Sequence, residues 1–170
     1  MSTYTTQAYF LLPLSESQVN FALSVLNCIQ DRKLDFEDRR SAKTTSRYGA
    51  DCYNIAKQLY TKHEDAFDYE ERKLTFDVDV ESDGLWISHD ETLHSEAVAQ
   101  FCRLILKHFD LDTYVLIQAA RTADVVRPGA FGGHAAFVTK KGIKWMCTEK
   151  WLEQQARAFD REQSRVTATQ

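Results

Sequence analysis

The side chains best suited to chemistry lie around one glycine pair. His134 directly follows Gly132-Gly133, where the lack of Cβ atoms lets the backbone approach another group closely. Arg121 and Arg127 lie upstream, so an imidazole and two guanidinium groups could bind an anion or position a general base. The simpler interpretation is a β-bulge at the glycines, with Phe131 filling the core and His134 facing outward.

A second group of ligand-type side chains is the segment His89-Asp90-Glu91-Thr92-Leu93-His94. Imidazoles and carboxylates are metal ligands, but the two histidines are not spaced to share one helix face and do not form H-E-x-x-H. Acidic residues before a helix are also selected for capping and for the helix dipole. We therefore expect no metal, and no cofactor of any other kind.

Other catalytic motifs have weak support or none. The sequence has no glycine-rich phosphate loop and no G-x-S-x-G elbow. Cys147 could act as a nucleophile only if Lys144, Lys150 or the start of the last helix lowered the pKa of its thiol. A buried structural thiol is the simpler interpretation.

Carboxylates in alternating positions form the strongest electrostatic feature, at Asp77, Asp79, Glu81 and Asp83. Along a strand they would lie ~7 Å apart, a charge density comparable with that of nucleic-acid phosphates. Such a face, with Trp86 nearby, would attract a basic protein surface. A solvated strand edge that is kept acidic for solubility is the alternative.

The overall charge and hydropathy exclude several classes of protein. The net charge of −4 argues against direct binding to nucleic acid, which favours a basic excess. The first residues, from Met1 to Tyr4, lack the basic and apolar regions of a secretion signal, so we expect none. No apolar run approaches the ~20 residues of a membrane helix. The four cysteines form no C-x-x-C pair and are expected to be free thiols, so we expect a cytoplasmic protein.

Hydrophobic periodicity and turn residues predict the elements that must position these groups. Strands are expected at 4–12, 74–81, 85–88, 114–117, 134–139 and 143–147, helices at 15–30, 50–62, 93–108 and 148–159, and a loop at 31–47. The order βααββαβββα predicts an α+β fold with a mainly antiparallel sheet and helices packed on one face. We expect a single domain over 1–159, with the last helix docked on the sheet, and a frayed polar tail over 160–170.

The hairpin around Asp83-Gly84 has two possible registers. A two-residue loop would place Trp86 opposite Glu81, on the acidic face. A three-residue loop that includes Ser82 would move Trp86 to the buried face. The sequence does not decide between the two.

Several short motifs together resemble small uncharacterised proteins carried on phages and plasmids. The similarity covers most of residues 5–155 and is carried by Gly84-Leu85-Trp86, Asp90-Glu91, Arg127-Pro128, Phe131-Gly132-Gly133, Thr139, Trp145, Thr148 and Trp151-Leu152. That family is expected to have a third small residue where this chain has His134. The resemblance implies a mobile genetic element as the setting and carries no established activity.

The hypothesis that follows is a non-enzymatic accessory protein that binds a host protein with a basic surface, inhibiting a defence or DNA-processing complex. The acidic residues and Trp86 would form its binding surface. The alternative is a small enzyme or anion-binding domain centred on Arg121, Arg127 and His134. A homodimer formed through an exposed edge strand is a further alternative.

Overall fold

A computed structural model describes residues 4–31, 34, 36, 47–67, 75–91, 93–125 and 130–167, with side chains as far as Arg161 and excepting that of Asp65. Its elements are β1 (Tyr4–Pro13), α1 (Glu16–Gln30), α2 (Ala50–Lys62), the short 3-10 helix η2 (Glu64–Ala66), β2 (Asp77–Glu81), β3 (Gly84–His89), α3 (Ser95–His108), β4 (Tyr114–Ala123), β5 (Gly132–Thr139), β6 (Gly142–Cys147) and α4 (Thr148–Thr167). Most of the predicted 31–47 loop lies outside the described residues, as does Arg127.

The strands form one six-stranded antiparallel sheet in the order β2-β3-β1-β4-β5-β6. The predicted α+β class and element order are therefore confirmed. β1 lies in the middle, pairing with β4 through its first half and with β3 through its second half. Alternate residues of β1 (Ala8, Phe10 and Leu12) are buried, which fixes the side of the sheet that faces the core.

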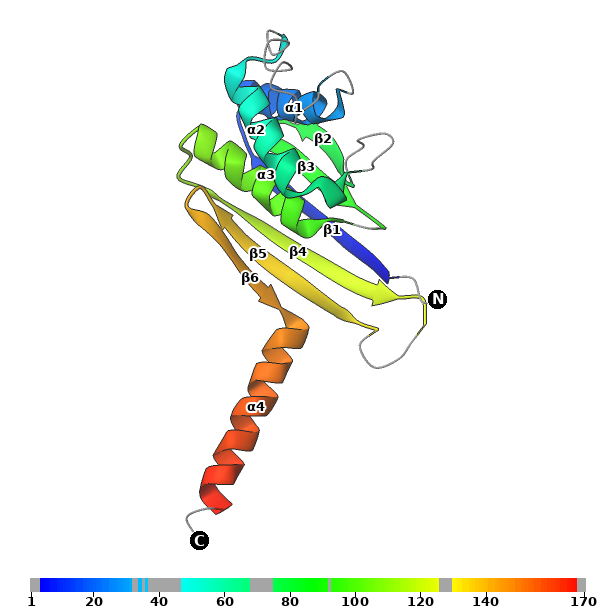
Figure 1. The fold of residues 1–170 in the computed structure, drawn as a ribbon, viewed down its shortest axis with the longest axis vertical. Coiled ribbons are helices and arrows are strands. Elements are labelled where there is room, and N and C mark those ends of the chain that lie inside the picture. Colours follow the sequence, from blue (N-terminus) through cyan, green and yellow to red (C-terminus); the bar gives the residue numbers. More distant parts are fainter. Residues whose placement is uncertain are drawn as a thin grey trace.

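Helices α1, α2 and α3 all cover the same face of the sheet (Figure 1). α3 contributes most to the core, because Phe101, Ile105 and Leu106 are fully buried. α1 begins with the predicted capping box, in which the Ser15 backbone N–H donates to the Gln18 side chain at 2.9 Å. None of the described helices lies on the opposite face of the sheet (Figure 1), which we call the open face.

The last helix does not dock on the sheet, and that prediction is wrong. α4 leaves the end of β6 and points away from the rest of the molecule (Figure 1), and it continues to Thr167, past the predicted end at Phe159. Trp151, Leu152 and Phe159 are 50%, 59% and 61% exposed. Along the described residues, none of the helices is long and apolar enough to span a lipid bilayer.

The β2–β3 hairpin adopts neither predicted register. Glu81 pairs with Gly84, so the loop is Ser82-Asp83 and Gly84 belongs to β3. Gly84 has φ of +144°, and a Cβ there would overlap the carbonyl oxygen of Leu12 and lie 2.8 Å from the backbone nitrogen of Leu14. The close approach of β3 to β1 therefore requires glycine at this position and sets the register.

All four cysteines are free thiols. Cys28, Cys52 and Cys102 are buried, and Cys147 is half-buried. Cys28 and Cys52 hydrogen-bond to each other where α1 and α2 pack together. Burial raises the pKa of Cys102, which keeps this thiol protonated and unreactive.

Candidate functional site

The predicted acidic residues and Trp86 lie together at one end of the open face. Asp77 pairs with Ser88, Asp79 with Trp86 and Glu81 with Gly84, and paired residues of an antiparallel sheet share a face. Asp77, Asp79, Glu81 and Asp83 are all exposed. With Trp86 they make up the acidic hairpin surface, and β2 lies at the edge of the sheet formed by the described strands.

Tyr9 extends the acidic hairpin surface with a second aromatic ring. Its ring stacks on Trp86 with centroids 4.7 Å apart and an interplanar angle of 16°, and Tyr9 is 66% exposed. The Trp86 indole donates a hydrogen bond to the Asp83 carboxylate at 3.1 Å, which fixes the pair beside the charges. The sequence interpretation missed Tyr9, although alternation with the apolar Ala8 and Phe10 already places it on the other face of β1.

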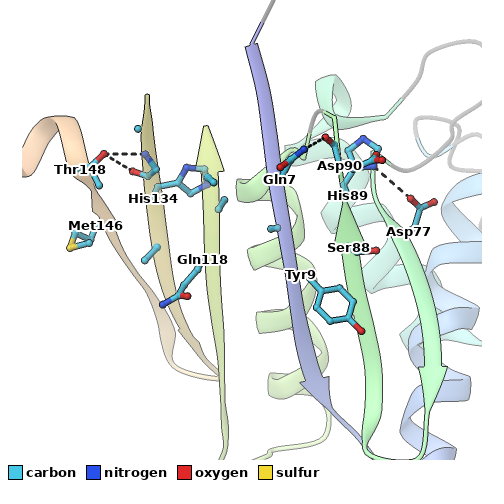
Figure 2. A pocket seen from close by; sticks show the side chains of 16 residues that line it. Gln7, Tyr9, Asp77, Ser88, His89, Asp90, Gln118, His134, Met146 and Thr148 are labelled. Atoms are coloured by element: carbon cyan, nitrogen blue, oxygen red, sulfur yellow. Dashed lines mark hydrogen bonds and ion pairs between the residues drawn. The ribbon is translucent and has the colours of Figure 1, made fainter. Parts of the chain in front are cut away.

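Beside this surface the open face is hollowed, with a volume of about 920 Å³ (Figure 2). Small residues of β4 and β5, such as Ala120, Gly133 and Ala135, form part of its lining. Figure 2 labels further residues of the lining; on the open face these are Gln7, Tyr9, Asp77, Ser88, Asp90, Gln118, Met146 and Thr148. His89 and His134 also border the hollow, although their strand pairing puts them on the helix-covered face. Few charged side chains line the hollow, so it suits a polar or apolar group of a binding partner.

A second cleft, of about 830 Å³, lies where the end of α2 and the start of α3 meet β6 and α4. Its lining includes Thr6, Lys62, His63, Leu93, His94, Ser95, Glu96, His134, Trp145, Met146, Cys147 and Lys150. The cleft contains the shortest polar contact around His134, between His134 Nε2 and Ser95 Oγ at 2.6 Å. Because Ser95 opens α3, this hydrogen bond ties the helix to β5.

The β-bulge interpretation of the glycine pair is wrong. The β4–β5 pairing is unbroken, with Ala119 opposite His134 and Ala120 opposite Gly133. His134 therefore faces the helices, while Phe131 is 61% exposed and fills no core. A Cβ on Gly133 would lie 2.8 Å from the Ala119 carbonyl oxygen, so glycine permits close strand pairing in place of a bulge.

The environment of His134 favours its neutral form. Burial lowers its pKa below the ordinary 6.5, the Arg121 guanidinium lowers the pKa further, and Glu96 acts in the opposite direction. Arg121 lies on the neighbouring strand and the same face, where it forms an ion pair with Glu149 at the start of α4. It also lies over the Tyr4 ring, 5.4 Å from the centroid. The structure thus brings two of the three predicted anion-site residues together, and Arg127 lies outside the described residues.

The remaining candidates do not form one centre. His94 caps α3, accepting a hydrogen bond from the Ala97 backbone N–H at 3.4 Å, whereas His89 Nδ1 lies 3.7 Å from the Asp77 carboxylate. Within the described ranges, no three His, Cys, Asp or Glu side chains are arranged to hold a metal ion. Cys147 pairs with His134 across β5 and β6 and lines the cleft.

Comparison with protein-family models, with curated protein sequences and with solved structures finds no match for this chain. Function must therefore be argued from the two sites themselves.

Proposed function

We propose that this protein is a non-enzymatic binding protein whose acidic hairpin surface captures a basic surface of a partner protein. The observation that carries the proposal is the row of exposed carboxylates at Asp77, Asp79 and Glu81 beside the stacked pair of Tyr9 and Trp86. Carboxylates attract lysine and arginine, and exposed aromatic rings add cation–π and apolar contact. Trp and Tyr are also the residues that most often dominate binding energy at interfaces.

The partner class follows from the spacing of the charges. Successive carboxylates on one face of a strand lie ~7 Å apart, a line of negative charge comparable with that of a nucleic-acid backbone, which a basic protein groove binds. We propose a mobile genetic element as the setting, in line with the resemblance of the sequence motifs. The partner would then be a host protein, such as a defence or DNA-processing complex that carries such a groove. The protein would then occupy the groove in place of nucleic acid.

The test compares capture of host proteins by the wild type and by the isosteric triple variant Asp77→Asn, Asp79→Asn, Glu81→Gln. Bound proteins are identified by mass spectrometry at low and at high salt, because exposed ion pairs weaken above a few tenths molar salt. The control variant neutralises three exposed carboxylates elsewhere, Glu16→Gln, Glu64→Gln and Glu91→Gln. The proposal predicts one partner that is salt-sensitive, lost in the hairpin variant and kept in the control; equal capture by all three proteins would overturn it.

Binding of a small anion in the cleft is a second candidate function, favoured by Lys62, Lys150 and the helix start at Ser95 around His134. Catalysis there would need His134 as the base for the Ser95 hydroxyl, and in the described part of the chain no carboxylate hydrogen-bonds to the His134 ring. Titration with inorganic phosphate, followed by amide NMR shifts, tests this function. Shifts confined to the cleft and abolished by Lys150→Ala would support it, and no shifts at millimolar phosphate would reject it.

A further inference from the structure

One side of α4 is apolar and uncovered. Trp151, Leu152 and Phe159 lie on the same side of the helix at i, i+1 and i+8, and each is at least half exposed. Charged residues lie on the other side, where Arg157 and Glu153 form an ion pair of 3.7 Å. In proteins most of the stability of a helix comes from burial of its apolar side, so we expect another surface to cover this side of α4.

The chain's own sheet cannot provide that cover, because contacts at the first turn fix the direction of α4. The Thr148 hydroxyl oxygen lies 3.0 Å from the Gly133 backbone nitrogen and 3.1 Å from the Gly133 carbonyl oxygen. The adjacent Glu149 forms its ion pair with Arg121 on β4. No loop separates β6 from α4, so the helix continues outward from the sheet edge (Figure 1).

The same chain has a second uncovered apolar surface, on the part of the open face away from the acidic hairpin surface. It consists of Tyr114, Leu116, Phe137 and Met146, which are 53%, 54%, 40% and 51% exposed. Tyr114 and Phe137 stack with ring centroids 5.3 Å apart. We call these four residues the apolar sheet surface; a monomer with both this surface and the α4 side exposed would aggregate readily.

We propose that two copies of this chain exchange α4, so that the apolar side of each helix lies on the apolar sheet surface of the other copy. Each chain then provides one helix and one sheet face, and a two-fold axis closes the assembly as a dimer. The four residues of the apolar sheet surface carry no charge, and Lys144, which pairs with Phe137, lies beside them on the edge strand β6. The ion-paired side of α4 stays in water. The acidic hairpin surface lies at the opposite end of the sheet and remains free, so the proposal does not depend on the proposed function.

The dimensions of the two surfaces agree. α4 has 20 residues and would be ~30 Å long, while β4 has 10 residues and would be ~33 Å long. Trp151 and Phe159 lie ~12 Å apart along the helix. The apolar sheet surface extends from Tyr114 to the row of Met146, which is paired through Ala135 to Gln118, or ~13 Å along the strands.

The buried area suits a weak dimer. If α4 lies along the strands over its whole length of ~30 Å, with a width of ~10 Å, it would cover roughly 300 Å² of the sheet and lose a similar area itself. The matched apolar residues make up ~12 Å of that length. Two such contacts remove roughly 1,200 Å² from water, at the lower limit of stable interfaces. An interface of this size predicts a dimer that dissociates on dilution.

The first test measures the mass of the full chain by sedimentation equilibrium over a range of concentrations. We expect twice the 19.6 kDa of one chain at high concentration. The helix variant Leu152→Glu with Phe159→Glu and the sheet variant Leu116→Glu should each be monomeric, and the control Arg157→Gln should remain dimeric. Circular dichroism and urea unfolding must show that each variant is folded; a monomeric wild type would overturn the proposal.

The second test distinguishes helix exchange from pairing of two α4 helices. Two proteins in a Cys147→Ser background, one with Leu116→Cys and one with Phe159→Cys, are mixed and treated with a short bismaleimide. Helix exchange predicts crosslinks between position 116 of one chain and position 159 of the other. Crosslinks that join only position 159 to position 159, or a dimer that survives Leu116→Glu, would overturn the proposal.

Discussion

The two faces of the sheet differ in what covers them, although they are formed by the same strands. On the helix-covered face, residues such as Ile87, Ile117 and Val138 are fully buried. The residues that precede them in the same strands, Trp86, Leu116 and Phe137, lie on the open face. They are also apolar, but they are partly or largely exposed. An open face that only contacted water would be polar, with hydrophobic residues on one side of each strand.

The residues buried under the helices stabilise the fold, whereas the exposed residues of the open face are available to bind a partner. The core between sheet and helices is complete without the open face, since α3 alone provides several fully buried side chains. The apolar residues of the open face are therefore not needed to complete the core, and their presence needs another explanation. The proposed partner and the proposed second copy each account for one end of it.

The largest expected loss of stability comes from shortening a side chain at the centre of the core between the sheet and the helices. Phe101→Ala removes a fully buried ring and should reduce the free energy of unfolding by about 3–5 kcal/mol. Tyr9→Ala on the open face should reduce it by about 1 kcal/mol or less, because Tyr9 is largely exposed. Urea unfolding measures both. A loss for Tyr9→Ala as large as that for Phe101→Ala would show that the open face belongs to the folding core.

The next largest loss of stability is expected at Gly84, where β3 approaches β1. Gly84→Ala forces an L side chain into positive φ and against the Leu12 carbonyl, and should cost about 2 kcal/mol or more. Gly142→Ala is the matched control, because nothing lies within 4 Å of its added Cβ. The control should leave stability unchanged or raise it by up to about 1 kcal/mol. Equal effects in urea unfolding would mean that the hairpin register does not depend on Gly84.

Local patterns were enough to predict the elements and the class of the fold. The alternation of Phe76, Val78 and Val80 with acidic residues marked β2, and helical periodicity marked α1 and α3. The sequence also grouped the acidic residues correctly with Trp86, because alternation along a strand is a local property.

Non-local contacts decided what the sequence could not predict. The hairpin register depends on how Gly84 meets Leu12, far away in the sequence. The side taken by His134 depends on regular pairing with Ala119, and the direction of α4 on the hydrogen bonds of Thr148 to Gly133. Periodicity finds an apolar side of a helix, but it does not show which surface covers it.

A smaller effect concerns His134, a titratable group on the covered side of the sheet. Its folded pKa lies below the ordinary 6.5, chiefly through burial, so the unfolded state binds the proton more tightly. The stability that neutral His134 contributes is therefore complete above pH 6.5 and is lost as the pH falls below it. Urea unfolding between pH 7.5 and pH 5.5 should show this loss in the wild type and a weaker dependence in His134→Gln. The same slope in both proteins would contradict the burial of His134 against Ser95.

The smallest effect on the free energy of unfolding is expected at the acidic hairpin surface. A substitution there tests whether the carboxylates serve partner binding or folding. Asp79→Asn should change the free energy of unfolding by less than about 0.5 kcal/mol at physiological salt, because the side chain is exposed. At low salt the variant should be slightly more stable than the wild type, since Asp77 and Glu81 lie ~7 Å away on either side, within the screening length of ~10 Å at 0.1 M salt. Urea unfolding at two salt concentrations measures this difference, and a clear loss of stability would assign the carboxylates to the fold. If the carboxylates lower the stability of the fold at low salt but are required for partner capture, partner binding explains why they lie on the edge strand β2.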